Sequence, residues 1–138
     1  MITEDYVPFE TAKLLKEKGF DEYGMYFYTL KDEGCEGYKS NRTLREFAHN
    51  SDPDLKDRAV SCPTLQMALK WLREEKHYYI QIMLDSWALG DHSGFYVVIQ
   101  KTDSDFEMML ADAVDNVLYE TYEIAANVAL IYVLEELI

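Results

Sequence analysis

Two segments of the chain repeat apolar residues at the spacing of an amphipathic helix. The first opens at Pro8 and closes at Gly19, residue types that suit the start and the left-handed end of a helix. The second places residues three or four apart on one apolar stripe, which consists of Leu65, Ala68, Leu69 and Leu72. These patterns predict helices over residues 8–18 and from residue 63 or 64 to residue 76.

Three further segments predict strands because their apolar and aromatic residues fill alternate positions. They cover residues 25–30, 78–84 and 95–101. In the second, Ile80, Ile82 and Leu84 share one face. The last two strands follow one another with a single loop between them, which implies an antiparallel pair.

The segments between these elements carry weaker patterns. Residues 31–40 contain glycine and several charges, and they predict a loop or a hairpin turn. Residues 43–49 predict one or two helical turns. Residues 50–61 predict an exposed connection. Residues 106–120 fit two short strands, at 106–110 and 117–119, or a continuation of the last helix, and we favour the strands.

The C-terminal segment predicts a helix that Thr121 caps and that runs to Leu137. Its expected buried face consists of Ala125, Ala129, Tyr132, Val133 and Leu137, with Ile124, Val128 and Ile131 alongside. This face is wider than one contact of a surface helix requires. We therefore expect the helix to be central in the fold or to be covered by a second copy of the chain, in a homodimer formed through residues 121–137.

Together these elements predict an α+β fold in a single domain over residues 1–138. The expected architecture is a small, mainly antiparallel sheet of about three to five strands with about three helices packed on one face. Hydrophobic residues make up 49% of the chain, which is enough for a core and argues against disorder.

The charge of the chain is concentrated in its second half. The formal net charge is −13, of which residues 77–138 contribute −10 because they hold 11 acidic residues and one basic residue, Lys101. A field of this sign repels phosphate backbones, so we expect no direct binding of nucleic acid. It favours a solvated acidic surface, or a protein partner with a basic surface.

The cysteines and the hydropathy predict a cytoplasmic protein that does not bind membranes. Cys35 and Cys62 form neither a C-x-x-C motif nor a zinc spacing. The chain shows no signal-peptide pattern and no run of about 18 apolar residues. We therefore expect free thiols and a cytoplasmic location.

The loop that follows the strand over 78–84 holds the candidate surface residues, Trp87, Asp91 and His92. With Asp85, the last two could form a carboxylate–histidine pair or hold a metal ion. Aspartate, serine and glycine also serve turn geometry in such a loop, and a tryptophan there commonly anchors the loop to the core. We favour the turn.

No other residue carries a recognisable catalytic or ligand-binding motif, so we predict no catalytic residue, cofactor or metal. His77 suits the end of a helix, and His49 has no obvious partner in the sequence. Cys62 lies close to a helix start, which can activate a thiol, but a buried cysteine is the better interpretation. The many tyrosines of the strands suggest a binding surface, although tyrosine is also a common strand residue.

Three segments, taken in order, resemble a family of small uncharacterised proteins of gut anaerobic bacteria and their phages and prophages. They are residues 9–20 (FETAKLLKEKGF), residues 63–74 (PTLQMALKWLRE), and Thr121-Tyr122-Glu123 leading into the alanine-rich final helix. The family carries no known activity, so the resemblance transfers no functional residue. It implies a phage or mobile-element context and a cytoplasmic location.

Three functions are compatible with the sequence. The first is a non-enzymatic accessory protein, associated with phages, that acts by protein–protein contact. The second is an acidic mimic of DNA that inhibits a nucleic-acid-binding protein, which requires carboxylates spaced like phosphates. The third is an enzyme that uses the loop from Asp85 to His92.

Overall fold

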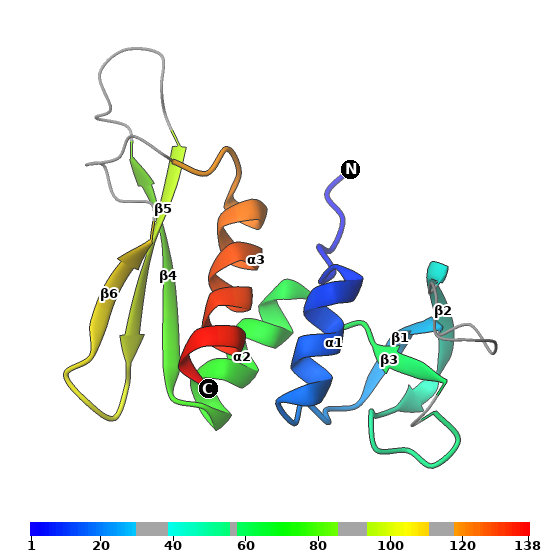
Figure 1. The fold of residues 1–138 in the computed structure, drawn as a ribbon. Coiled ribbons are helices and arrows are strands. Elements are labelled where there is room, and N and C mark those ends of the chain that lie inside the picture. Colours follow the sequence, from blue (N-terminus) through cyan, green and yellow to red (C-terminus); the bar gives the residue numbers. More distant parts are fainter. Residues whose placement is uncertain (30–38, 56–57, 86–93, 111–117) are drawn as a thin grey trace. The chain divides into compact units, whose positions relative to one another are not determined.

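The computed structural model describes residues 1–29, 39–55, 58–85, 94–110 and 118–138. Within these ranges the chain forms two compact units, Met1–Thr64 and Leu65–Ile138. Each unit holds a three-stranded antiparallel sheet, and the described residues form three α-helices (Figure 1). The α+β class and the antiparallel pairing are confirmed. The strands, however, form two sheets, where the sequence predicted one.

The first unit combines the helix α1 (Phe9–Glu17) with the sheet β2-β1-β3. Its strands are β1 (Gly24–Thr29), β2 (Lys39–Ala48) and β3 (Ala59–Ser61). Gly19 ends the α1 region with a φ of +97°, the left-handed conformation that the sequence predicted. Tyr28 reaches from β1 to donate a hydrogen bond of 2.7 Å to the carbonyl of Val7, which fixes the N-terminal segment against the sheet.

Two predictions for the first unit are wrong. Residues 43–49, expected to form helical turns, belong almost entirely to β2, because their pairing with β1 outweighs their weak local preference. Residues 50–61, expected to be an exposed connection, contain β3, whose three residues are all buried. A strand as short as β3 shows no measurable alternation in the sequence.

The second unit combines two helices with the sheet β4-β5-β6. Its helices are α2 (Leu65–Glu75) and α3 (Tyr122–Tyr132), and one π-helical turn, η1 (Val133–Leu137), continues α3. Its strands are β4 (Tyr78–Asp85), β5 (Gly94–Lys101) and β6 (Glu107–Leu110). The predicted stripe of α2 is buried, and β6 confirms the strand that we favoured after residue 106.

The final helix begins as the sequence predicted, but its buried face is rotated. The Thr121 side chain accepts a hydrogen bond of 3.1 Å from the backbone N–H of Ile124, which is an N-cap. The fully buried residues are Ala125, Ala126, Ala129, Leu130, Val133 and Leu134. Ile124, expected to lie beside the buried face, is exposed. The helix packs on β4 and β5, so much of its apolar surface is covered within the chain.

Candidate functional site

The loop singled out by the sequence gives no site in the described part of the chain. Trp87, Asp91 and His92 lie in residues 86–93, outside the described residues. Asp85, which precedes them, is the last residue of β4 and pairs with Gly94 of β5. The turn that we favour for this loop, and the alternative of a catalytic or metal-binding role, both stay predictions.

His77 serves the turn between α2 and β4. It has a φ of +63°, the left-handed region that non-glycine residues rarely adopt. Its carbonyl accepts hydrogen bonds from the backbone N–H of Thr102 at 2.7 Å and from the Thr102 hydroxyl at 3.2 Å. These bonds stabilise the tight turn from the helix into the sheet.

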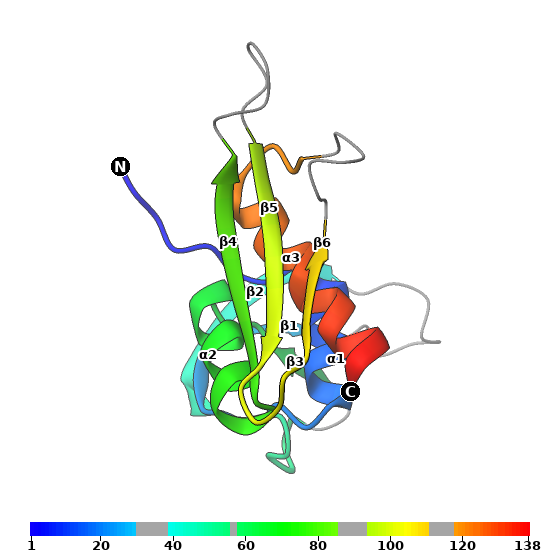
Figure 2. The same ribbon diagram turned by 90° about the vertical axis from the view of Figure 1, so that its left-hand side faces the viewer.

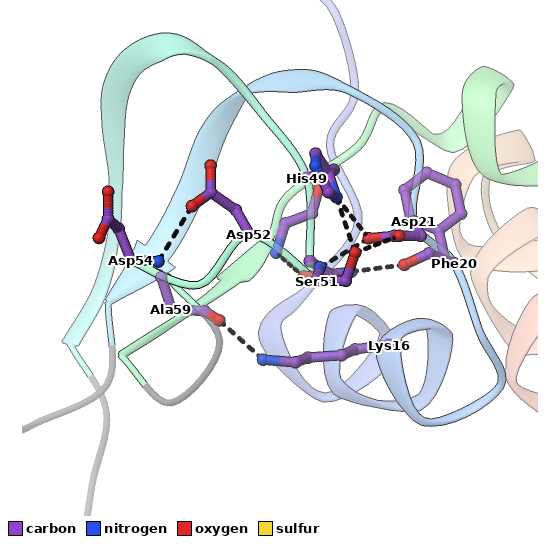
Figure 3. A network of polar contacts seen from close by, with 10 residues as sticks. Lys16, Phe20, Asp21, His49, Ser51, Asp52, Asp54 and Ala59 are labelled. Atoms are coloured by element: carbon purple, nitrogen blue, oxygen red, sulfur yellow. Dashed lines mark hydrogen bonds and ion pairs between the residues drawn. The ribbon is translucent and has the colours of Figure 1, made fainter.

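A cluster of polar side chains that the sequence did not reveal joins two connections of the first unit (Figure 3). Asp21 lies between α1 and β1, and His49 and Ser51 follow β2. Asp21 Oδ1 accepts a hydrogen bond of 2.6 Å from the Ser51 backbone N–H and lies 3.0 Å from His49 Nδ1. The Ser51 hydroxyl donates to Asp21 Oδ2.

These are the residue types of a hydrolase triad, but the geometry is not that of a triad. In a triad, the carboxylate and the hydroxyl bond to opposite nitrogens of the imidazole. Here Asp21 and the Ser51 Oγ, at 2.9 Å, both approach His49 Nδ1. Because the Ser51 proton is directed at Asp21, the imidazole does not activate the hydroxyl. The cluster therefore has a structural role: it holds the α1–β1 connection against the segment that follows β2.

The electrostatics of the cluster fit a structural role. Partial burial alone would raise the pKa of Asp21, but the hydrogen bonds from the Ser51 side chain and backbone, with the His49 ring, outweigh it. The pKa of Asp21 therefore lies below its ordinary value.

The polar side chains around the cluster also form hydrogen bonds to the backbone, which indicates a structural role. A hollow of about 320 Å³ adjoins it. Lys16, which lines this hollow, donates a hydrogen bond of 3.1 Å to the carbonyl of Ala59. Buried Asn50 links the same segments, since its side-chain amide donates a hydrogen bond to the Phe20 carbonyl and accepts one from the Ser61 N–H.

Neither a reactive thiol nor a metal site occurs among the described residues. Cys62 is buried, and its thiol donates to the carbonyl of Val7 at 3.8 Å, which fits a packed core cysteine. Within the described ranges, no three histidine, cysteine or carboxylate side chains gather closely enough to hold a metal ion.

The second unit presents a sheet face that no other described element of this unit covers (Figure 2). Val97 and Ile99 of β5 are fully buried, so the face that they occupy is the inner one, on which α3 packs. Directly paired residues of neighbouring strands share a face, and successive residues alternate between faces. The outward side chains, which we call the open face, are Tyr79, Gln81, Met83, Tyr96, Val98, Gln100, Glu107 and Met109.

The open face is apolar over much of its area. Tyr79, Met83 and Met109 are exposed by 41%, 40% and 50%, and Tyr96 and Val98 are half-buried. Met83 pairs directly with Tyr96, and Val98 pairs with Met109, so these side chains are contiguous across the three strands. Contiguous exposed apolar area on a sheet is typical of a binding surface.

Polar groups form one row across the open face, and further polar groups lie at the end of the sheet near the β5–β6 hairpin. Gln81 donates to Gln100, and Gln100 donates to Glu107 at 2.9 Å, so each amide has a partner. A hollow of about 410 Å³ lies beside Gln100 and Glu107 at the β5–β6 hairpin. Lys101 lies 3.7 Å from the Asp103 carboxylate and near the Tyr78 ring. The one basic residue of this half of the chain is thus paired with an acid.

Comparisons with protein-family models, with curated proteins and with solved structures find no match to this chain. No described helix combines the length and the apolar character needed to cross a membrane. The geometry of the open face and the net charge of residues 77–138 therefore carry the functional argument.

Proposed function

We propose that this protein acts by protein–protein contact, through the open face of the β4-β5-β6 sheet, and not by catalysis. The observation that carries the proposal is the contiguous apolar group of Met83, Tyr96, Val98 and Met109 on a sheet face that no other described element of the second unit covers. Such a surface offers area for burial against a partner. The resemblance to proteins of phages and prophages suggests an accessory role in that context.

The net charge of residues 77–138 selects the class of partner. Residues 77–138 carry a net charge of −10, and their only basic residue is Lys101. A partner with apolar side chains at its centre and lysine or arginine at its rim complements this surface. A second copy of the chain would bring another −10 to the same contact, so we favour a different, basic protein over the homodimer.

A random peptide display library, selected against the purified protein, tests the proposal. The face variant Met83→Ser with Met109→Ser removes apolar area without changing charge. The control variant Met25→Ser with Phe47→Ser removes exposed apolar side chains of the first unit. We expect selected peptides to combine basic and apolar residues, to lose binding to the face variant and to keep binding to the control variant.

Two results would contradict the proposal. One is a set of selected peptides that bind the face variant as well as the wild type. The other is a selection in which acidic or neutral sequences dominate, because this would show that the charge of residues 77–138 does not choose the partner.

The same charge supports a second candidate function, mimicry of DNA. The described carboxylates of this half of the chain occur at separate places: Asp85 at the end of β4, Asp103, Asp105 and Glu107 at the hairpin, Glu120 and Glu123 at the start of α3, and Glu135 and Glu136 in η1. The apolar open face separates several of these groups, which favours the first proposal. Mimicry instead predicts that Asp105→Asn with Glu107→Gln abolishes binding of basic peptides while the face variant retains it.

A further inference from the structure

The backbone of β4 presents one edge that pairs with no described strand. The sheet order is β4-β5-β6, so β4 has β5 on one side only. The direction of the β5 backbone groups shows which residues of β4 face outward. Phe95 and Tyr119 exchange two hydrogen bonds of 2.8 Å, and the Lys101 N–H donates to the Phe106 carbonyl at 3.0 Å. Odd-numbered residues of β5 therefore direct their N–H and C=O groups away from β4.

Alternation along an antiparallel strand assigns the remaining groups. The even-numbered residues of β5 bond to β4 at their register partners, which are Tyr79, Gln81, Met83 and Asp85. The residues of β4 between these positions direct their backbone groups to the outer edge. These outward residues are Tyr78, Ile80, Ile82 and Leu84.

Among the described sheet edges, β4 alone lacks the usual protection against pairing with another chain. Natural edge strands are kept short or carry lysine, proline or inward-pointing charge. In the first unit, the pairing of β2 with β1 has two register shifts, and irregular pairing of this kind also protects an edge, while β3 has only three residues. β6 has four residues and begins with Glu107. β4 has eight residues, and its only charge is Asp85 at the end.

The inner face of β4 is also incompletely covered. Ile99 and Val97 of β5 are fully buried, whereas their direct partners Ile80 and Ile82 are only half-buried. Leu84, on the same inner face, is 60% exposed. The burial of the inner-face side chains therefore decreases towards the β4 edge. One more strand at this edge would extend the sheet and reduce the exposure of these side chains.

The helix α2 covers only part of this edge. It contacts β4, and both views place it beside the first half of the strand (Figures 1 and 2). The second half of β4 extends beyond α2 in both views. The outward groups of Ile82 and Leu84 lie in this second half.

We propose that the outer edge of β4 takes up an extended, basic segment of the partner as an additional antiparallel or parallel strand. This inference rests on the proposed function, and it names the conformation and chemistry of the bound segment. Strand addition supplies main-chain hydrogen bonds along an exposed edge, and alternate side chains supply specificity. Residues 65–76 add Lys70, Arg73 and Lys76 against Glu74 and Glu75, so the second unit has a net charge of −9. Lysine or arginine on the added strand complements this charge.

Amide hydrogen exchange in the isotope-labelled full chain tests this directly. The probe is a short, end-blocked peptide of alternating lysine and valine, and the same peptide with glutamate in place of lysine is the control. At saturation, we expect exchange at Ile82 and Leu84 to slow by about tenfold or more with the lysine peptide only. The amides of Tyr79, Gln81 and Met83, which already bond to β5, change little. Unchanged exchange at the two edge amides would overturn the inference.

A pair of variants at one position separates the backbone from the side chain. Ile82→Pro removes an N–H that does not bond to β5, and proline is tolerated at such edge positions. Ile82→Ala loses the same side chain but keeps the N–H. We expect the proline variant to bind the lysine peptide about tenfold more weakly than the alanine variant. Equal affinities would contradict strand addition, and the exchange experiment decides the matter if the proline variant fails to fold.

The two proposals can fail separately. Protection of the edge amides in both the wild type and the face variant, at equal affinity, would support the edge site and refute the open face as the binding surface. Loss of binding in the face variant, without protection of the edge amides in the wild type, would refute strand addition alone. Protection of the edge amides that rises with protein concentration in the absence of peptide would identify a second copy as the occupant, which overturns the basic partner.

Discussion

Replacing Asp21 with alanine removes the acceptor that holds the two connections of the first unit together. Its carboxylate accepts from the Ser51 N–H and hydroxyl and contacts the His49 ring. Hydrogen bonds to a charged group contribute about 1.5–3 kcal/mol each when buried, but the Asp21 side chain is 44% exposed, and water replaces part of that. We therefore expect Asp21→Ala to lower the free energy of unfolding by about 1–2 kcal/mol in total.

Urea unfolding followed by circular dichroism measures this effect. Glu22→Ala is the matched control, because it removes a neighbouring exposed carboxylate. We expect it to change the free energy of unfolding by no more than about 0.5 kcal/mol. Equal effects of the two substitutions would refute the structural role of the cluster.

The pH dependence of the same variants gives a second check. The folded pKa of Asp21 lies below its ordinary value of 3.8, so the carboxylate stabilises the fold above the unfolded pKa. That contribution is lost as the pH falls through the folded pKa. The difference between the wild type and Asp21→Ala should therefore be full at about pH 7 and shrink below about pH 4. A difference that grows on acidification would contradict the assigned direction.

Three substitutions test other features of the fold. Thr121→Ala removes the cap on the Ile124 N–H and should cost about 1 kcal/mol in urea unfolding, whereas Thr121→Ser should restore most of it. Gly94→Ala would place a Cβ 2.5 Å from the Leu118 Cβ, so we expect a loss of about 1–3 kcal/mol. Leu118→Gly, which removes that Cβ, should partly relieve the loss in the double variant, and additive losses would contradict the close approach. His77→Gly relieves a positive φ and should raise the thermal midpoint, in contrast to His77→Ala.

The sequence predicts those elements whose patterns are decided locally. The stripe of α2, the alternation of β4 and β5, and the Thr121 cap all combine a strong period with clear end residues. They are confirmed within a residue or two.

The failures concern elements that depend on pairing. β2 lies at a sheet edge and is held by β1, so its polar composition resembled helical turns. The division of the strands between two sheets is a matter of long-range pairing, which alternation within one strand does not encode. Cross-strand partners, not single-strand patterns, decide both outcomes.

The candidate site was only partly accessible from the sequence. Tyr79 and Tyr96 fit the expected tyrosine-bearing surface, but Tyr78, one residue away, is buried on the opposite face. Met83 and Met109 join that surface only because β5 lies between their strands. The contact of His49 with Asp21 could not be predicted from the sequence either, because the two residues lie 28 positions apart along the chain.

The methionine methyl groups offer the most direct test of the central claim, that the open face binds a basic partner. Met83 and Met109 lie on the open face, while Met25 and Met67, exposed by 42% and 41%, lie elsewhere and serve as internal controls. The spectrum of methyl-labelled protein would be recorded during titration with a basic, apolar peptide from the display selection. The account predicts that the Met83 and Met109 methyl signals shift with a common saturation curve while the Met25 and Met67 signals do not. Shifts confined to Met25 or Met67, or binding with no shift at Met83 and Met109, would contradict it.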